Sequence, residues 1–496
     1  MGDRAAFDIA VVGGGAAGCV VAARLAESGS RSVVLLEAGP DRRADLPEDI
    51  RDGWDMTTDF DWGYVAEPDE LGVVRKVRRV KLLGGTSSIT RFALRGAPAD
   101  YDEWEALGNP GWGWKDVLPY FKRIEADADF GYEPWHGDRG PIPVDRYRDV
   151  EQTEVHAATV RALEASGFPR VEDHNRPGAV GVGRMPMSST NGVRMTTAAA
   201  YLPVGGTPPN LTIRADAQVA DLLFDGTRVT GVRLVDQAII DASVVVLCAG
   251  TYGSPPILLR SGIGPVEHLR SIGIPVRVDL PGVGVNLADH PAILMDTGYH
   301  GPARTPPQLH SVATYHSTTA STAGPPDLML WINDPDPPED APQYPIDILL
   351  LKPRSRGSVR LRSADPSDPP RIDLPNLREA SDLERLAEAY RRAHEIAADR
   401  EIRQLCGDPP SPAIGDRADL LEVVRQGARS VPHVVGTCSM GPEPDDGAVV
   451  DGSGRVFGTE RLYVVDASIM PTVPSGFTHL PTIMIAERLS ERITGP

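Results

Sequence analysis

The chain has 496 residues, of which 41% are hydrophobic and 24% charged, so it is long enough to bury a large core and to form more than one domain. Its 69 acidic residues outnumber 50 basic ones, and the net charge of -19 argues against nucleic acid and anionic membranes as partners, because both attract a positive face. No apolar run approaches the roughly 20 residues that span a bilayer, so the sequence predicts no transmembrane helix.

The chain opens with a strand, a glycine-rich turn, a helix and a second strand. Residues 7–12 are apolar except for Asp8, Gly13-Gly14-Gly15-Ala16-Ala17-Gly18 follows, residues 19–28 have helical spacing, and residues 32–36 lead to Glu37. Gly13, Gly15 and Gly18 match a dinucleotide-binding fingerprint, in which they permit a tight turn, close approach to a pyrophosphate and close helix packing. Glu37 is placed to accept hydrogen bonds from a ribose. The fingerprint fits FAD and NAD equally.

Only six residues precede this unit, which leaves no room for a secretion signal, so we expect a cytoplasmic protein. The four cysteines are widely spaced and form no C-x-x-C pair. They indicate neither a disulfide framework nor a metal site, and we expect no bound metal; they are Cys19, Cys248, Cys406 and Cys438.

Further elements follow in chain order. We expect helices at 99–107 and 114–125, an antiparallel meander over 211–234 with a hairpin turn at Asp225-Gly226, a buried strand over 242–248 and a helix from 254. Residues 301–345, rich in Pro, Thr and Ser, predict an irregular surface segment, with a loop over a site as the alternative. A helix over 381–399, a strand over 461–466 and a final helix from Pro481 complete the pattern.

The fingerprint and four further blocks resemble the glucose-methanol-choline (GMC) flavoprotein oxidoreductases. The blocks are Leu83-Gly84-Gly85-Thr86-Ser87-Ser88-Ile89 with Arg95-Gly96, Gly250-Thr251-x-x-Ser254-Pro255-x-Ile257-Leu258-x-x-Ser261-Gly262-Ile263-Gly264, Pro281-Gly282-Val283-Gly284-x-Asn286-Leu287-x-Asp289-His290, and Asp466-Ala467-Ser468-Ile469-Met470-Pro471. They are spread over nearly the whole chain. The first block departs from the family at Thr90, where Asn or His is usual, and it is one residue shorter, which puts a side-chain contact with the flavin N5 edge in doubt.

The resemblance implies an α/β fold, α+β overall. A Rossmann-like FAD-binding domain would comprise residues 1–125, 205–300 and 440–496. A discontinuous substrate domain on an antiparallel sheet would comprise residues 126–204 and 301–439. A monomer or homodimer is expected.

The resemblance also implies FAD as the cofactor. Glycines 84 and 85 would let backbone lie against a flat ring, and Pro481, suited to the first helical position, would begin a helix whose dipole points at the flavin. No histidine occurs between Leu83 and Gly96, so noncovalent FAD is expected. The expected cofactor-binding residues are Gly13, Gly15, Ala16, Ala17, Gly18, Glu37, Ala38, Leu83, Gly84, Gly85, Thr86, Ser87, Ser88, Thr90, Val219, Ala249, Gly250, Asp466, Ala467, His479, Pro481 and Thr482.

Two histidines match the family's catalytic positions. His433 lies in a His-x-x-Gly-Thr context and His479 lies shortly before a Pro-Thr pair. Alcohol oxidation removes the O–H proton together with a hydride that passes to flavin N5, and imidazole has a pKa suited to that proton. We assign His433 as general base and His479 as the group that positions the alcohol oxygen, with helix capping as the alternative for His479. His290 and His394 are expected to be structural.

The predicted function is FAD-dependent oxidation of a primary alcohol, aromatic or otherwise apolar, to an aldehyde, with O2 or another acceptor taking the electrons. The blocks Asp100-Tyr101-Asp102-Glu103-Trp104 and His136-Gly137-x-x-Gly140-Pro141-Ile142-Pro143 resemble bacterial members that act on aromatic or furan alcohols. A flavoprotein lyase with a redox-idle flavin is the alternative from another enzyme class. A noncatalytic flavin-binding protein is the third interpretation.

Overall fold

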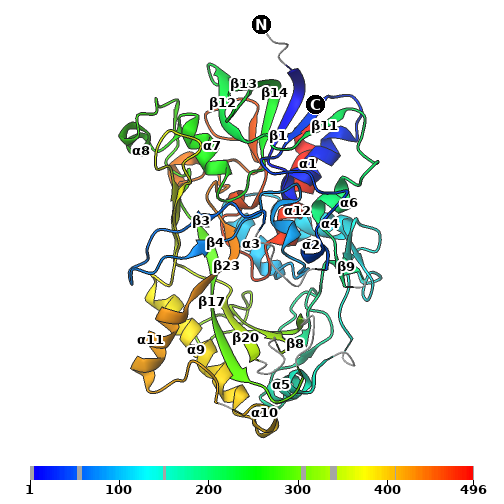
Figure 1. The fold of residues 1–496 in the computed structure, drawn as a ribbon, viewed down its shortest axis with the longest axis vertical. Coiled ribbons are helices and arrows are strands. Elements are labelled where there is room, and N and C mark those ends of the chain that lie inside the picture. Colours follow the sequence, from blue (N-terminus) through cyan, green and yellow to red (C-terminus); the bar gives the residue numbers. More distant parts are fainter. Residues whose placement is uncertain are drawn as a thin grey trace.

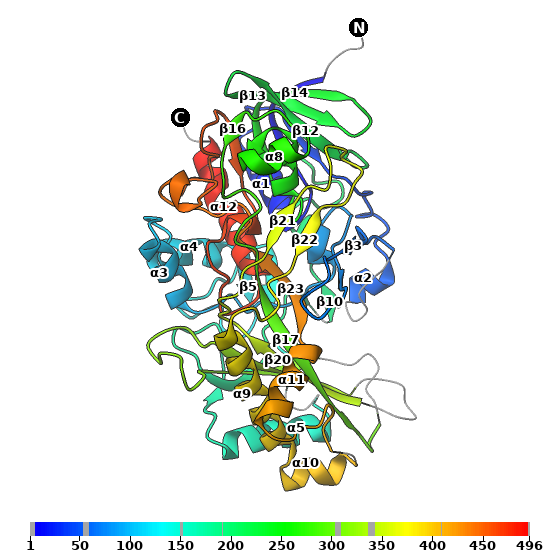
Figure 2. The same ribbon diagram turned by 90° about the vertical axis from the view of Figure 1, so that its left-hand side faces the viewer.

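The computed structural model describes residues 5–52, 59–148, 152–190, 192–302, 309–335, 343–407 and 409–494. The two largest sheets that these residues form, each of seven strands, lie at opposite ends of an elongated molecule and are covered by helices (Figures 1 and 2). This mixed α/β architecture, with one mostly parallel and one mostly antiparallel sheet, confirms the predicted fold class. No helix among the described residues is both long and apolar enough to cross a membrane.

The first sheet is built around parallel strands from both ends of the chain. Its order is β11 (Leu211–Arg214), β2 (Val33–Leu36), β1 (Ala5–Val12), β14 (Ile239–Leu247), β13 (Arg228–Leu234) and β12 (Val219–Asp225), and β24 (Leu462–Val464) also pairs with β14. Four pairs are parallel: β11–β2, β2–β1, β1–β14 and β14–β24. The β14–β13 and β13–β12 pairs are antiparallel. Helices cover both faces of such a sheet. Its strands are rich in valine because both of their sides are buried.

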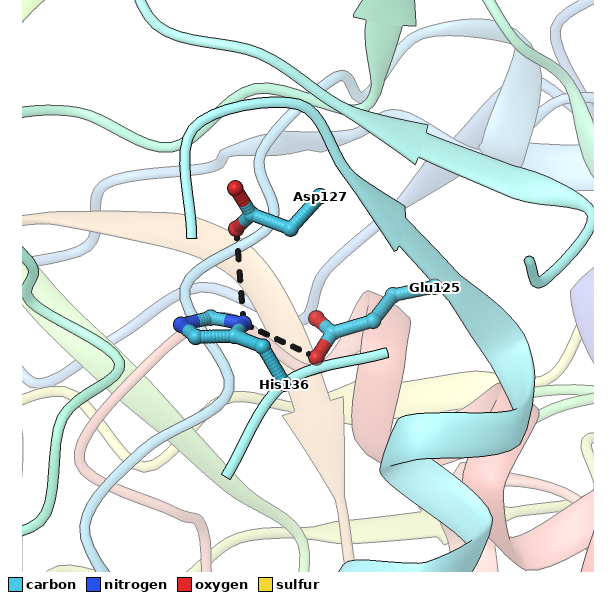
Figure 3. Close-up of side chains that lie close together, drawn as sticks. All are labelled: Glu125, Asp127 and His136. Atoms are coloured by element: carbon cyan, nitrogen blue, oxygen red, sulfur yellow. Dashed lines mark hydrogen bonds and ion pairs between the residues drawn. The ribbon is translucent and has the colours of Figure 1, made fainter. Parts of the chain in front are cut away.

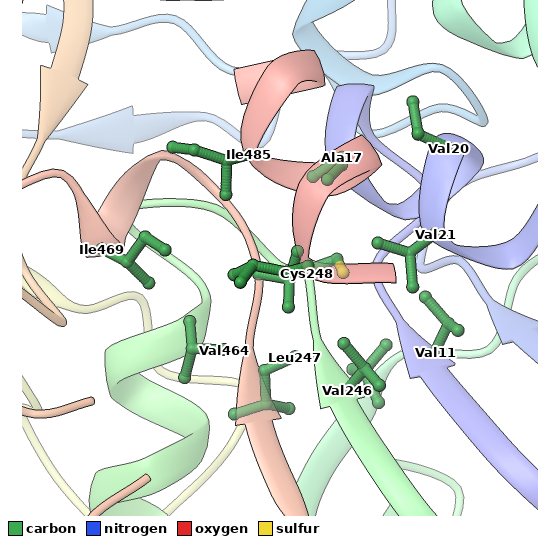
Figure 4. Close-up of a cluster of buried hydrophobic side chains, with 14 of the residues drawn as sticks. Val11, Ala17, Val20, Val21, Val246, Leu247, Cys248, Val464, Ile469 and Ile485 are labelled. Carbon is green, nitrogen blue, oxygen red and sulfur yellow. The ribbon is translucent and has the colours of Figure 1, made fainter. Parts of the chain in front are cut away.

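Helix α1 (Ala16–Ala26) packs against strands β1, β2 and β11 of this sheet and against helix α12 (His479–Thr494). Figure 4 shows Val11 and Val246 of the central strands, Val21 of α1 and Ile485 of α12 pointing into one core. All four side chains are fully buried. The two ends of the chain are therefore held side by side, and their loops meet at one edge of the sheet.

The second sheet supplies the other half of the molecule. Its order is β23 (Arg429–Val435), β17 (Ala288–Gly298), β20 (Gln343–Leu350), β19 (Leu328–Asn333), β18 (Leu309–Tyr315), β8 (Gly181–Arg184) and β7 (Arg170–Val171), antiparallel except for β7–β8. The helices beside it are α5 (Glu154–Ala165), α9 (Ala380–Ala397), α10 (Arg400–Leu405) and α11 (Arg417–Gly427). Strand β17 falls inside the range 205–300 assigned to the FAD-binding domain, yet it pairs in this sheet.

Shorter elements connect the two halves. They are α2 (Glu48–Asp52), β3 (Tyr64–Val65), β4 (Lys76–Val77), η1 (Gly85–Ser88), α3 (Pro98–Ala106), α4 (Trp114–Ile124), β5 (Glu125–Asp127), β6 (Ile142–Val144), β9 (Ser189–Thr190), β10 (Val193–Arg194), α6 (Thr197–Tyr201), α7 (Ser254–Arg260), β15 (Ile263–Gly264), α8 (Val266–Ser271), β16 (Val278–Asp279), β21 (Ser358–Arg360), β22 (Arg371–Asp373), η3 (Pro444–Asp446) and η4 (Ala467–Ile469). The helices expected at 99–107, 114–125, 254 and 381–399 are confirmed as α3, α4, α7 and α9.

Two expectations about strands are corrected. Strand β11 pairs in parallel with β2 and is not part of a meander with β12, because alternation identifies a strand but does not select its partner. The segment 301–345 was expected to be irregular, yet its described part forms β18, β19 and the start of β20, with Val312 and Leu330 buried. Residues 303–308 and 336–342 lie outside the described residues. Strands buried on both faces lack the alternation that marks half-exposed ones.

A buried ionic network follows α4 (Figure 3). Both ring nitrogens of His136 bond carboxylates, Nδ1 with Glu125 at 2.9 Å and Nε2 with Asp173 at 3.1 Å. The Arg146 guanidinium donates to both oxygens of Asp127 at 2.9 and 3.0 Å. Burial lowers the pKa of His136, but the hydrogen bonds to Asp173 and Glu125 outweigh it and raise that pKa above its ordinary value. The Arg146 guanidinium thus lies against one of the carboxylates that, together with His136, could ligate a metal.

Candidate active site

A cavity of about 710 Å³ lies between the two sheets, beyond the carboxyl ends of β1, β2 and β14. In open α/β sheets this edge is where ligands bind. Most of the predicted site residues line the cavity: Gly13, Gly15, Ala16, Ala17, Glu37, Ala38, Gly85, Thr86, Ser87, Thr90, Val219, Ala249, Gly250, His433, Asp466, Ala467, His479 and Thr482. The remaining five are not among its lining residues: Gly18, Leu83, Gly84, Ser88 and Pro481.

The glycines after β1 are required for different reasons. Gly13 has a φ of +98°, and a Cβ there would lie 2.6 Å from the Cys248 carbonyl oxygen. A Cβ on Gly18 would lie 1.8 Å from the Gly13 carbonyl oxygen, so its absence lets α1 pack against the loop. Gly15 has an ordinary φ of -78°, and its Cβ would approach only Gly85, at 4.0 Å. The space over Gly15 is therefore open.

The second glycine segment lies directly against the first. The Gly84 N–H donates to the Gly14 carbonyl at 2.7 Å, and the Ser87 hydroxyl donates to the Gly84 carbonyl at 2.6 Å. A Cβ on Gly85 would come within 2.7 Å of the Gly15 Cα atom. Gly84 therefore supports the first loop from behind, while Gly85 and Ser87 form cavity wall.

Glu37 lies just after β2 and lines the cavity. Its Oε2 accepts from the Gly14 N–H and its Oε1 from the Gly39 N–H, each at 2.7 Å. Burial raises the pKa of Glu37 to about 7, although these N–H groups act in the opposite direction. Each carboxylate oxygen can accept a second hydrogen bond, so a ribose hydroxyl could still be bound there.

Asp466 connects two segments of the wall. Its Oδ2 accepts from the Ser254 hydroxyl at 2.6 Å and the Gly250 N–H at 2.9 Å, while its Oδ1 accepts from the Ser468 N–H at 2.8 Å. Burial raises the pKa of this carboxyl. The carboxylate thereby holds Gly250 and Ala467, which both line the cavity.

His433 is directed into the cavity by an irregularity in strand β23. The β17–β23 ladder pairs Ala288 with Val435 and His290 with Val431, which leaves a bulge around His433. Pro432, which has no N–H, is tolerated at such a bulge. The N–H of His433 donates instead to the Asp289 carboxylate at 3.0 Å.

The imidazole of His433 contacts a second histidine. His290, expected to be structural, has its Nδ1 3.0 Å from Nδ1 of His433, so it contacts a predicted catalytic residue directly. The sequence feature that could have identified His290 is its place at the end of the family block that runs from Pro281 to His290. Burial first, and then His290 and Arg79, hold the pKa of His433 well below its ordinary value, so the ring is neutral near neutral pH.

His479 is the first residue of α12, and its Nε2 is buried without a hydrogen-bond partner. A buried nitrogen of this kind needs a partner, which a ligand in the cavity could provide. Burial, and then Arg194, lower the pKa of His479 to about 4. The helix begins two residues before Pro481, which therefore occupies the third helical position and not the first; its missing N–H is still unneeded in the first turn.

Three aromatic side chains that were not predicted from the sequence form a cluster that contacts His433 through Phe477. Phe92 lies 4.6 Å from Trp331 and 4.7 Å from Phe477, measured between ring centroids. Phe477 in turn packs edge-on against His433 at 4.8 Å. All four line the cavity, which therefore has an apolar, aromatic region beside the two histidines.

The donor groups and shape of the cavity fit a dinucleotide. The N-terminal residues of both α1 and α12 line it, and free N–H groups at helix starts favour phosphate and other anionic groups. Gly15 leaves open space beside these N–H groups. The volume is in the range of cofactor sites.

Comparison with known proteins agrees with a cavity that binds a dinucleotide. The GMC oxidoreductase family matches residues 7–292 and 353–486. The chain is 36% identical to 5-(hydroxymethyl)furfural oxidase of Methylovorus sp. (strain MP688) over 98% of each chain, and 34% identical to oxygen-dependent choline dehydrogenase 1 of Chromohalobacter salexigens over 99% of this chain and 95% of that one. The structure of pyridoxine 4-oxidase from Mesorbium loti superposes with a TM-score of 0.90 at 30% identity, covering 98% of both chains.

These matches extend over nearly the whole chain and include both sheets and the cavity between them. They confirm the resemblance inferred from the five sequence blocks. The chain belongs to the GMC oxidoreductase family, whose typical cofactor is FAD and whose members act on CH–OH donors.

Proposed function

We propose that the protein oxidises a primary alcohol, aromatic or otherwise apolar, to an aldehyde, with His433 as the general base. The observation that carries this proposal is the neutral His433 ring in a cavity wall that also contains the unpartnered Nε2 of His479. The aromatic side chains of Phe92, Trp331 and Phe477 beside them support a flat, apolar substrate.

The two histidines would have separate roles in the reaction. His433 removes the hydroxyl proton of the alcohol, because a neutral imidazole can accept a proton and a protonated one cannot. His479 forms a hydrogen bond with the alcohol oxygen and so orients the carbon that carries the hydride. FAD, when bound by the residues around Gly15, Glu37 and Gly85, would supply the hydride acceptor. The aromatic rings exclude water from the reacting carbon.

The names of relatives agree with a ring-containing substrate. Two of the similar proteins are named for oxidation of 5-(hydroxymethyl)furfural and of pyridoxine. Another is named for choline, a cationic alcohol without a ring. We assign the first class to this chain because aromatic side chains predominate beside His433, although a cation could also be held over an aromatic face.

Anaerobic mixing with a panel of alcohols tests the proposal. Benzyl alcohol and 5-(hydroxymethyl)furfural should bleach the flavin absorbance faster than hexanol or choline. His433→Ala should slow bleaching about a hundredfold or more, the usual effect of losing a general base. The matched control is His394→Ala, whose imidazole hydrogen-bonds the Pro412 carbonyl outside the cavity and should not affect the rate.

Two outcomes would contradict this assignment. Cleavage of an aromatic cyanohydrin without any bleaching by alcohols would indicate a lyase with a redox-idle flavin. An unchanged rate in His433→Ala would remove the general base from the proposal. Admitting air to the reduced enzyme then identifies the acceptor, since rapid return of the yellow colour with peroxide indicates O2 and slow return indicates another acceptor.

The proposal includes noncovalent FAD. Precipitation with acid should release the flavin into solution, because the segment from Leu83 to Gly96 contains no histidine that could hold it covalently. Retention of the yellow colour in the washed precipitate would contradict this part of the proposal.

A further inference from the structure

We infer that His290 is a positioning residue that fixes the tautomer of His433, so that the base presents an unprotonated Nε2 to the substrate. The inference rests on the proposed function, in which His433 is the general base. It adds a role for a residue that makes up neither the aromatic region nor the cofactor cradle. His433 and His290 belong to a short chain of hydrogen bonds that ends at a backbone carbonyl.

The chain of hydrogen bonds ends at a carbonyl oxygen, which has a fixed role as acceptor. Nε2 of His290 lies 3.1 Å from the Pro474 carbonyl oxygen, which can only accept a hydrogen bond. His290 must therefore carry its proton on Nε2. The Pro474 and Leu351 carbonyls both raise the pKa of this imidazole.

The imidazole of His290 is neutral. The side chain is fully buried, and burial lowers its pKa to about 3 despite the two carbonyl groups. A neutral imidazole with its proton on Nε2 has an unprotonated Nδ1, which can only accept. Nδ1 of His433 lies 3.0 Å away, so His433 must donate from Nδ1, and its Nε2 is left without a proton.

Within the part of the chain that the structure describes, the His433 ring makes no hydrogen bond besides the one with His290. From β17, the Asp289 carboxylate accepts from the backbone N–H groups of both His290 and His433, at 2.8 and 3.0 Å, and thereby sets the two rings relative to each other. Phe477 offers an aromatic edge contact to the ring of His433. Arg79 acts on His433 as a positive charge, which favours the neutral ring.

Two substitutions separate this role from simple packing. His290→Asn can place its Oδ1 near the position of Nδ1 and still accept from His433. His290→Phe keeps the ring shape but offers no acceptor. The phenylalanine variant should slow flavin reduction by about tenfold or more, a range typical of losing the partner that orients a catalytic histidine, whereas the asparagine variant should keep most of the rate.

The tautomer itself can be measured without substrate. In ¹⁵N-histidine-labelled holoenzyme, His433→Gln identifies the His433 resonances by their loss. The wild type should show a protonated Nδ1 and an unprotonated Nε2 on His433, and His290→Phe should shift this population toward Nε2–H. His394→Phe is the control and should change neither the spectrum of His433 nor the rate.

A proton on Nε2 of His433 in the wild type would overturn the inference. Equal rates in His290→Phe and His290→Asn would also overturn it, because only packing would then matter. If His290→Phe does not fold, the wild-type tautomer still decides the question. A failure of every alcohol to reduce the flavin would contradict the proposed function alone, because the tautomer is read in the resting enzyme.

Discussion

Gly15→Ala separates a requirement of the fold from a requirement of the cofactor. The backbone at Gly15 has an ordinary φ of -78°, and an added Cβ would meet nothing closer than Gly85 Cα at 4.0 Å. The protein alone should therefore accept alanine without strain. If FAD lies in the cradle over Gly15, the added methyl group enters occupied space and should weaken FAD binding without unfolding the protein.

The expected loss of affinity follows from the cost of overpacking. Forcing one methyl group into a filled site costs about 1–3 kcal/mol, which corresponds to an increase in the Kd for FAD of roughly 5-fold to 150-fold. Titration of the apoprotein with FAD, followed by quenching of flavin fluorescence, measures this change. Gly324→Ala is the control, because its Cβ would meet only the Ser321 carbonyl at 3.4 Å, outside the cavity lining.

Two results would refute this reasoning. An unchanged Kd would mean that no cofactor group approaches Gly15. A large decrease in the melting temperature of the apoprotein would mean that the glycine serves the fold. Gly13→Ala provides the contrast, since its Cβ would lie 2.6 Å from the Cys248 carbonyl at a φ of +98° and should destabilise the apoprotein itself.

Two further predictions concern charge. The rate of flavin reduction should stay constant as the pH falls to 6.5 and decline only at lower pH: burial, His290 and Arg79 lower the pKa of His433, and protonation below that pKa removes the base. Stopped-flow reduction measures this profile, and a decline centred above pH 6.5 would contradict it. Arg146→Met removes a fully buried partner of Asp127 and should cost about 3–5 kcal/mol, a decrease in Tm of roughly 3–5 °C for a chain of this length. Arg139→Met, at a 91% exposed side chain, should change Tm by less than about 1 °C, and equal shifts in the two variants would show that burial does not set the cost.

The sequence alone was sufficient for features that lie close together along the chain. The strand, glycine loop, helix and second strand from Phe7 to Glu37 are contiguous, and each glycine serves a local requirement, so the fingerprint could be interpreted directly. The roles of His433 and His479 came from the family resemblance, because their short sequence contexts are distinctive. The helices α3, α4 and α9 were predicted from periodicity, since helix hydrogen bonds join near neighbours.

Tertiary structure decided every feature that depends on long-range pairing. Strand β11 selects β2, and the bulge that aims His433 exists only because β23 pairs with β17. The aromatic region combines Phe92, Trp331 and Phe477 from three distant segments, and His290 meets His433 across 143 positions of sequence. No local pattern encodes such contacts, because strand pairing and side-chain packing are fixed by burial across the whole fold. The sequence therefore determined the glycine loop and predicted the general base, whereas the fold decided which residues contact that predicted base.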